Sequence, residues 1–156
     1  MRNVHISAPG FILMDEMRKN MPDTLKKVGQ IGYDGIELLG FFGHTAKEIK
    51  AWCEDAGLTP IGCFVRIRDL DEEAVPEDVN ALSDFDRTLV IPGTTPEEKL
   101  QFVQDIGCRY VTLLLPDDMP VAEIARVYNK SVKLAEKHGI RLQYHNHAQE
   151  YRNQEN

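Results

Sequence analysis

The residues best suited to chemistry lie near the end of the sequence, in the run Tyr144-His-Asn-His-Ala-Gln-Glu150. Residues 140–144 have the character of a β-strand, and successive side chains on a strand point to opposite faces. We therefore expect His145 and His147 to point the same way, with Asn146 and Glu150 close by. Two imidazoles, an amide and a carboxylate in such a short run are suited to holding a divalent metal ion or a polyhydroxylated ligand.

Glycines divide the chain into repeated helix-to-strand units. Gly32, Gly57, Gly107 and Gly139 each follow an amphipathic helical pattern and precede a run rich in β-formers. Glycine just past a helix readily adopts the left-handed conformation that ends it. With an opening strand at residues 4–7, the pattern predicts five strands, at residues 4–7, 35–39, 61–66, 110–115 and 140–144.

Four helices are expected between these strands, and their starts carry recognisable signals. Thr45 to Glu48 and Thr95 to Glu98 have the spacing of capping boxes, in which the two residues of each pair satisfy one another's backbone N–H groups. A further helix is expected to start at Asp23 or Thr24, and the longest near Pro120. Alternating strands and helices indicate a parallel sheet with right-handed crossovers.

Residues 66–94 interrupt this alternation. They are acidic and lack a convincing amphipathic pattern, although residues 78–85 could form a short helix. Residues 88–91 are expected to be either a sixth short strand or a covering segment. We interpret the whole stretch as an enlarged strand-to-helix loop of the kind that covers a binding site.

The strand pattern also predicts which polar side chains face the centre of the sheet. If apolar residues face the helices, then Glu37, His5 and Arg66 point inward with His145 and His147. Charged groups there must be hydrated, paired or bound to a ligand, because burying unpaired charges costs several kcal/mol each. We expect Glu37, His5 and Arg66 to contact a ligand. The structural alternative is a network in which Glu37 pairs with Arg66 and the histidines bond to backbone groups.

Composition narrows the function classes. The net charge is −7, which argues against nucleic acid as a partner because binding to phosphates relies on a basic surface. No apolar run has the roughly 18 residues of a membrane span, and no secretory signal opens the chain. Three cysteines without a C-x-x-C pair are typical of buried thiols in a reduced, cytoplasmic protein.

Several of these runs together resemble the sugar phosphate isomerase/epimerase family, the xylose isomerase-like TIM barrels. The resemblance rests on residues 25–39, 56–58 and 106–110 and on the run from Tyr144 to Glu150. It implies an α/β fold, a (β/α)8 barrel, present here as about five parallel strands with intervening helices. The expected organisation is a single domain over residues 1–156, truncated on its carboxyl-terminal side.

The family resemblance also implies a chemistry. Such proteins move a proton next to a carbonyl of a sugar or cyclitol, assisted by a divalent cation such as manganese, magnesium, cobalt or zinc. By position, Glu150 resembles a family glutamate, either as a metal ligand or as the neighbouring proton-transfer group. His145 and His147 would line the sugar pocket or contact the metal, and Asn146 would line the pocket beside them.

The chain departs from the family pattern in its length. A complete barrel usually needs about 200 residues or more, and the strands that would carry the remaining metal ligands are absent from the sequence. We therefore expect the metal to be held weakly or not at all and the isolated chain to have little isomerase activity. The exposed edges of the first and last strands predict pairing with another copy or with a completing chain.

Three alternatives compete with this interpretation. The first is a non-catalytic sugar-binding or oligomerising remnant of the same family. The second is a metal-dependent endonuclease, since phosphodiesterases acting at abasic DNA sites share the barrel, but the acidic composition argues against it. The third is a flavodoxin-like open sheet. It would need a phosphate-binding loop after the first strand, where Ser7-Ala-Pro-Gly10 carries only one glycine.

Overall fold

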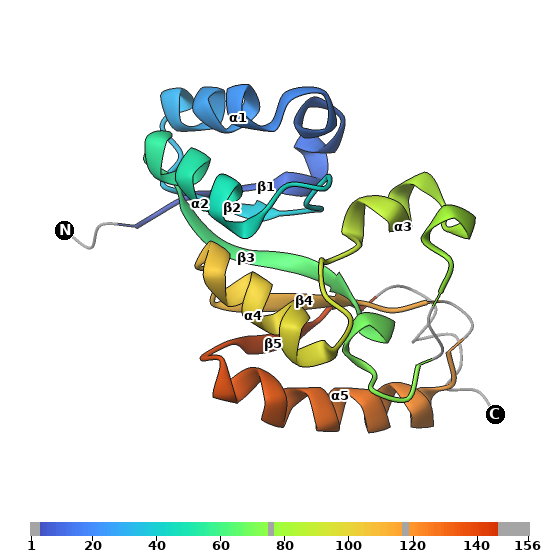
Figure 1. The fold of residues 1–156 in the computed structure, drawn as a ribbon. Helices are drawn as coiled ribbons and strands as arrows, with labels where there is room; N and C mark the ends of the chain where they lie inside the picture. The colour runs from blue at the N-terminus through green and yellow to red at the C-terminus, as the bar shows by residue number, and fades with distance from the viewer. Residues whose placement is uncertain (1–3, 75–76, 117–118, 147–156) are drawn as a thin grey trace.

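A single curved sheet of parallel strands forms the centre of the molecule. The computed structural model describes residues 4–74, 77–116 and 119–146. Within them the sheet has the order β1-β2-β3-β4-β5, and each neighbouring pair is parallel. Its strands are β1 (Ser7–Pro9), β2 (Gly35–Leu38), β3 (Thr59–Arg66), β4 (Tyr110–Leu114) and β5 (Arg141–Tyr144). The expected parallel α/β sheet is confirmed (Figure 1).

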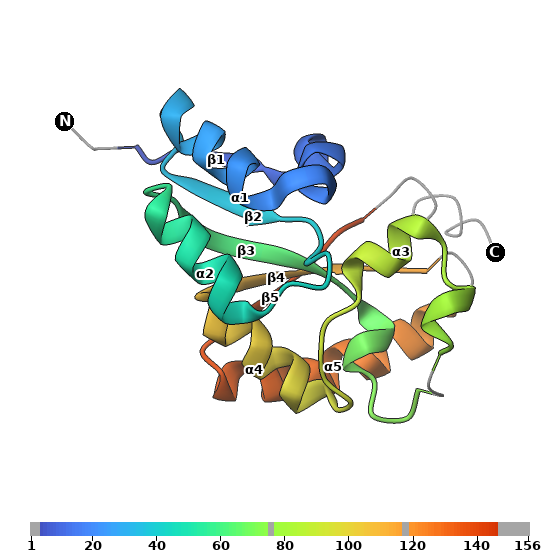
Figure 2. The same ribbon diagram turned by 45° about the horizontal axis from the view of Figure 1, so that its top comes forward.

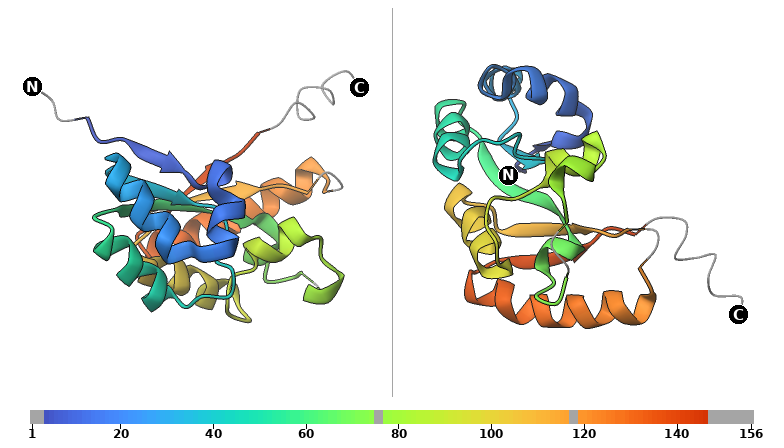
Figure 3. Two further views of the ribbon diagram at one scale, coloured as in Figure 1. Left: turned by 90° about the horizontal axis from the view of Figure 1, so that it is seen from above. Right: turned by 45° about the vertical axis from the view of Figure 1, so that its right-hand side comes forward.

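Four helices pack along the outer, convex side of this sheet. They are α1 (Met14–Ile31), α2 (Ala46–Asp55), α4 (Pro96–Ile106) and α5 (Val121–Lys137), and Figure 3 shows them arranged around the arc of strands. The core between the two layers is apolar, with Ile36, Cys63 and Val111 on the sheet packed against Leu25 and Val103 on the helices. None of the helices in the described ranges is long and apolar enough to cross a membrane.

The predicted helix starts are largely confirmed. Thr45 and Thr95 each accept a hydrogen bond from the backbone N–H three residues on, and Glu48 and Glu98 complete both capping boxes. The helix α5 has Pro120 at its N-cap. Gly32, Gly57, Gly107 and Gly139 all have positive φ, the conformation expected of them at the helix ends.

The first helix and the first strand differ from expectation. Helix α1 begins at Met14 and kinks at Asn20, whose side chain accepts a hydrogen bond from the backbone N–H of Asp23. Asn20, rather than Asp23 or Thr24, therefore caps the second half of that helix. Strand β1 covers Ser7–Pro9 instead of residues 4–7, because its neighbour β2 begins at Gly35 and pairs first with Ser7.

Residues 67–74 and 77–94, called the covering segment below, lie beside the carboxyl ends of the strands. In the described part they contain η2 (Ile67–Leu70), η3 (Val79–Ala81) and α3 (Asp84–Leu89), so residues 88–91 form no sixth strand. Figure 2 shows α3 next to the end of β3. The segment is anchored to the loop after β2, where the Phe41 N–H donates to the Thr88 carbonyl at 3.0 Å. Gly40 makes this approach possible, since a Cβ there would lie 2.7 Å from the same oxygen.

Candidate functional site

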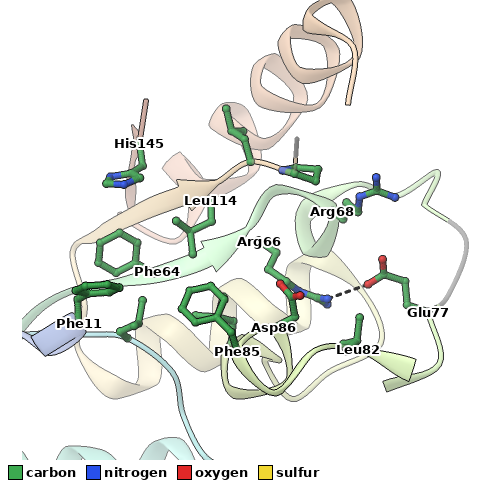
Figure 4. Close-up of a pocket in the computed structure, with 14 residues that line it drawn as sticks. Phe11, Phe64, Arg66, Arg68, Glu77, Leu82, Phe85, Asp86, Leu114 and His145 are labelled. Carbon is green, nitrogen blue, oxygen red and sulfur yellow. Dashed lines mark hydrogen bonds and ion pairs between the residues drawn. The ribbon is translucent and has the colours of Figure 1, made fainter. Parts of the chain in front are cut away.

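A cavity of about 690 Å³ opens at the carboxyl ends of the strands. Parallel sheets of α/β proteins commonly place their binding sites at this end. The covering segment forms one wall and the ends of β3, β4 and β5 form the opposite side (Figure 4). Among the described residues the lining is mostly apolar; it comprises Phe11, Leu39, Phe64, Arg66, Arg68, Glu77, Leu82, Phe85, Asp86, Leu89, Leu114, Leu115, Pro116 and His145. The expectation that the loop at residues 66–94 covers a site agrees with this geometry.

Arg66, at the end of β3, forms ion pairs with two carboxylates. Its Nε and Nη2 donate to the two oxygens of Asp69 at 2.8 and 3.0 Å, and its Nη1 donates to Glu77 at 2.8 Å. Lys99 of α4 donates to Asp69 at 2.7 Å. Burial opposes the charge of the guanidinium, but Asp69 and Glu77 outweigh it and raise the pKa of Arg66 above its ordinary range.

Glu37 points to the inner side of the sheet, as predicted, and pairs with Thr112 rather than with Arg66. The Thr112 hydroxyl lies 3.3 Å from Glu37 Oε1 and 3.1 Å from Gln143 Oε1. This polar row crosses from β2 through β4 to β5. The alternative in which Glu37 and Arg66 form a structural ion pair is therefore wrong.

His145 follows β5 and reaches the cavity. Its imidazole packs edge-to-face against Phe64 of β3, with the ring centroids 5.7 Å apart. Its backbone N–H donates to the Leu113 carbonyl at 3.3 Å, which continues the sheet pairing past Tyr144. Asn146 comes next and is exposed. A ligand in the cavity would therefore meet an imidazole edge beside an aromatic ring.

Comparisons with known proteins identify the architecture. The sequence matches no protein-family model, and a search of curated proteins finds no match. Among solved structures, a sugar phosphate isomerase/epimerase from Parabacteroides distasonis superposes with a TM-score of 0.68 at 19% identity, covering 97% of this chain and 54% of that one. The fold is that of a xylose isomerase-like TIM barrel.

Two further solved structures have the same fold. A xylose isomerase domain containing protein from Salmonella typhimurium superposes with a TM-score of 0.59 at 13% identity, covering 90% of this chain and 48% of that chain. The IolI protein with a bound zinc atom gives a TM-score of 0.55 at 12% identity, covering 90% and 51%. This chain spans about half the length of each, so five strands of the barrel are seen and the expected incomplete barrel is confirmed.

The half-barrel does not bring every predicted site residue to the cavity. His5 precedes β1, and its Nδ1 lies 3.6 Å from Asp34 Oδ1 just ahead of β2, at the amino ends of the strands. It is therefore separated from Arg66 and His145, which lie at the carboxyl ends. The physical reason is the short first strand, which starts two residues after His5. His147 and Glu150 lie outside the described residues.

The described part of the barrel contains no group of three or more His, Cys, Asp or Glu side chains arranged to hold a metal ion. The His145 imidazole packs against Phe64, and Glu37 Oε1 accepts a hydrogen bond from the Thr112 hydroxyl. Cys53, Cys63 and Cys108 are buried and carry no disulfide, as predicted. The donors in the described ranges therefore do not by themselves fit a divalent cation.

Several cavity residues were not predicted from the sequence. Phe64, which is in register with Thr112 of β4, has the inward parity of its strand, so the alternation that selected Glu37 contained the signal for it as well. Glu77, Phe85 and Asp86 come from the covering segment, which has no periodic pattern to indicate where its side chains point. Their place in the cavity is determined by how the covering segment folds over the strand ends.

Proposed function

We propose that the cavity at the carboxyl ends of the strands binds a sugar or cyclitol, as part of an isomerase/epimerase-type site. The main support is that Arg66 of β3 and His145, which follows β5, line the same cavity, where His145 packs against the ring of Phe64. Polar groups fix the orientation of hydroxyls, while an aromatic face packs against the apolar C–H groups of a sugar ring. The similar protein from Parabacteroides distasonis is itself described as a sugar phosphate isomerase/epimerase.

The remaining predicted residues take their roles around this cavity. We propose that His145 and Asn146 donate hydrogen bonds to ligand hydroxyls. We further propose that Glu37, which is hydrogen-bonded to Thr112, contacts the ligand from the inner side of the sheet. His147 is proposed to line the same pocket. Glu150 is proposed as a metal ligand or as the acid/base that moves the proton next to the carbonyl. No role in this cavity is proposed for His5, since His5 lies at the amino ends of the strands.

A divalent metal enters this proposal through the fold. When bound, manganese, magnesium, cobalt or zinc would polarise the carbonyl and hydroxyl oxygens of the sugar. The described residues of this chain do not supply its ligands, so no reaction step is assigned to the metal here. We propose that the isolated chain binds metal weakly or not at all and has little isomerase activity.

A second candidate function is a sugar-binding or oligomerising remnant without catalysis. The mostly apolar lining of the cavity favours it, because proton transfer requires titratable groups at the reacting carbon. In the described sheet, β1 and β5 each have one strand neighbour. We propose that these open edges pair with another copy or with a completing chain. Light scattering coupled to size exclusion would show a dimer or larger species; a monomer at all concentrations excludes pairing between copies.

Calorimetric titration tests the function. Glucose, xylose and myo-inositol are the ligand probes, each with and without manganese. We expect at least one of them to bind, and His145→Ala to weaken that binding. His44→Ala is the matched control, since His44 also packs edge-to-face on an aromatic ring, Trp52, but outside the cavity. Absence of binding by all three probes contradicts the proposal. Manganese binding together with sugar binding favours the isomerase-type site over the non-catalytic alternative.

A further inference from the structure

The guanidinium of Arg66 lies between two carboxylates in different surroundings. The Asp69 side chain is 4% exposed and binds Arg66 through two hydrogen bonds, while also accepting one from Lys99. The Glu77 side chain is 35% exposed and binds only the Nη1 edge at 2.8 Å. Asp69 is therefore a buried structural partner, whereas Glu77 reaches Arg66 from the covering segment at the edge of the cavity.

The charges around Arg66 need one more anion than the buried residues provide. Arg66, Lys99 and Asp69 together carry a formal charge of +1, and none of the three side chains is more than 16% exposed. An unbalanced charge so poorly hydrated requires a counter-ion. In this structure the counter-ion is the carboxylate of Glu77.

We propose that the Nη1 edge of Arg66 is a carboxylate subsite of the cavity and that Glu77 occupies it as an internal competitor. The position accommodates a carboxylate at hydrogen-bond distance, as Figure 4 shows for Glu77 itself. Charge-assisted bonds from arginine are among the stronger and more directional ones in proteins. The inference rests on the proposed function in using the same cavity, and it narrows the ligand class to sugar acids.

The test compares two sugars that differ at one carbon. Glucuronate carries a carboxylate where glucose carries a hydroxymethyl group, and both are titrated calorimetrically into the wild-type chain and Glu77→Gln. The substitution frees Nη1 of its charged competitor while keeping the side-chain shape. We expect glucuronate to bind Glu77→Gln roughly tenfold more tightly than the wild type, the size of one charged hydrogen bond. The affinity for glucose should not change.

Glu72→Gln is the matched control. It removes the same charge from an exposed residue of the covering segment that does not line this cavity. The inference is overturned if Glu72→Gln gains as much affinity, or if glucose gains as much as glucuronate. If glucose binds but Glu77→Gln leaves glucuronate binding unchanged, this inference fails and the proposed function stands. If neither glucose nor glucuronate binds either variant or the wild type, this inference fails, and the proposed function fails too if xylose and myo-inositol also do not bind.

Discussion

Glu37 on β2 and Gln143 on β5 are linked through one hydroxyl, that of Thr112 on the strand β4. The Thr112 oxygen lies 3.3 Å from Glu37 Oε1 and 3.1 Å from Gln143 Oε1. A hydroxyl has a single proton to donate, so the two acceptors compete for it. Thr112 is only 7% exposed, which makes it the buried centre of a polar row below the cavity.

Replacing Thr112 by valine keeps the shape of the side chain and removes the hydroxyl. We expect the free energy of unfolding to fall by about 1 kcal/mol, because Glu37 and Gln143 lose a shared partner. Urea unfolding followed by the fluorescence of Trp52 measures this. Thr112→Ser retains the hydroxyl and should keep the link between the strands. An increase in stability in Thr112→Val would show that the hydroxyl contributes nothing net.

Asp69 links the covering segment to both β3 and α4 through Arg66 and Lys99. Asp69→Asn removes the charge that pairs with both Arg66 and Lys99, and we expect a loss of about 3 kcal/mol in the free energy of unfolding because two poorly hydrated cations remain. Asp84→Asn is the control, since Asp84 is 85% exposed and its pair with Arg87 spans 3.7 Å. Similar urea midpoints for the two variants would contradict the importance of the buried cluster.

Local sequence signals predicted most of the half-barrel. The capping boxes at Thr45 and Thr95 depend on residues three positions apart, so their geometry is determined within one helical turn. The inward direction of Glu37 followed from the alternation of side chains along a strand. The extent of β1 was not predictable in this way, because it depends on where the partner strand β2 begins.

The polar contacts of the cavity were harder to predict. Arg66 was expected to face inward, but its partners Asp69, Glu77 and Lys99 are chosen by the path of the covering segment and by its packing on α4. Lys99 lies 30 residues from Asp69 along the chain. No periodic pattern encodes such a contact, since it arises only when distant elements assemble. The expected pairing of Glu37 with Arg66 failed for the same reason.

The buried thiols predict a pH dependence at the alkaline end. Burial raises the pKa of Cys53 to about 12, and contact with Cys108 together with burial raises that of Cys63. The unfolded chain therefore releases thiol protons at lower pH than the folded chain, so stability should fall as pH rises above roughly 9.

At pH 8 a thiol-specific disulfide reagent should react with all three cysteines only after unfolding. Rapid reaction of the folded chain would contradict the burial of Cys53, Cys63 and Cys108.

The carboxylate of Glu98 should titrate below its usual range. The backbone N–H and the hydroxyl of Thr94, together with the backbone N–H of Thr95, donate to it and lower its pKa. Because the folded-state pKa is the lower one, the stabilisation is present above the unfolded-state value and is lost as pH falls through the folded-state value. An NMR titration of the Glu98 side chain measures the midpoint. Thr94→Val removes the hydroxyl but keeps both backbone donors, so the titration midpoint of Glu98 should rise part of the way toward its ordinary value. A wild-type midpoint at the ordinary value for glutamate would show that the capping contacts do not form.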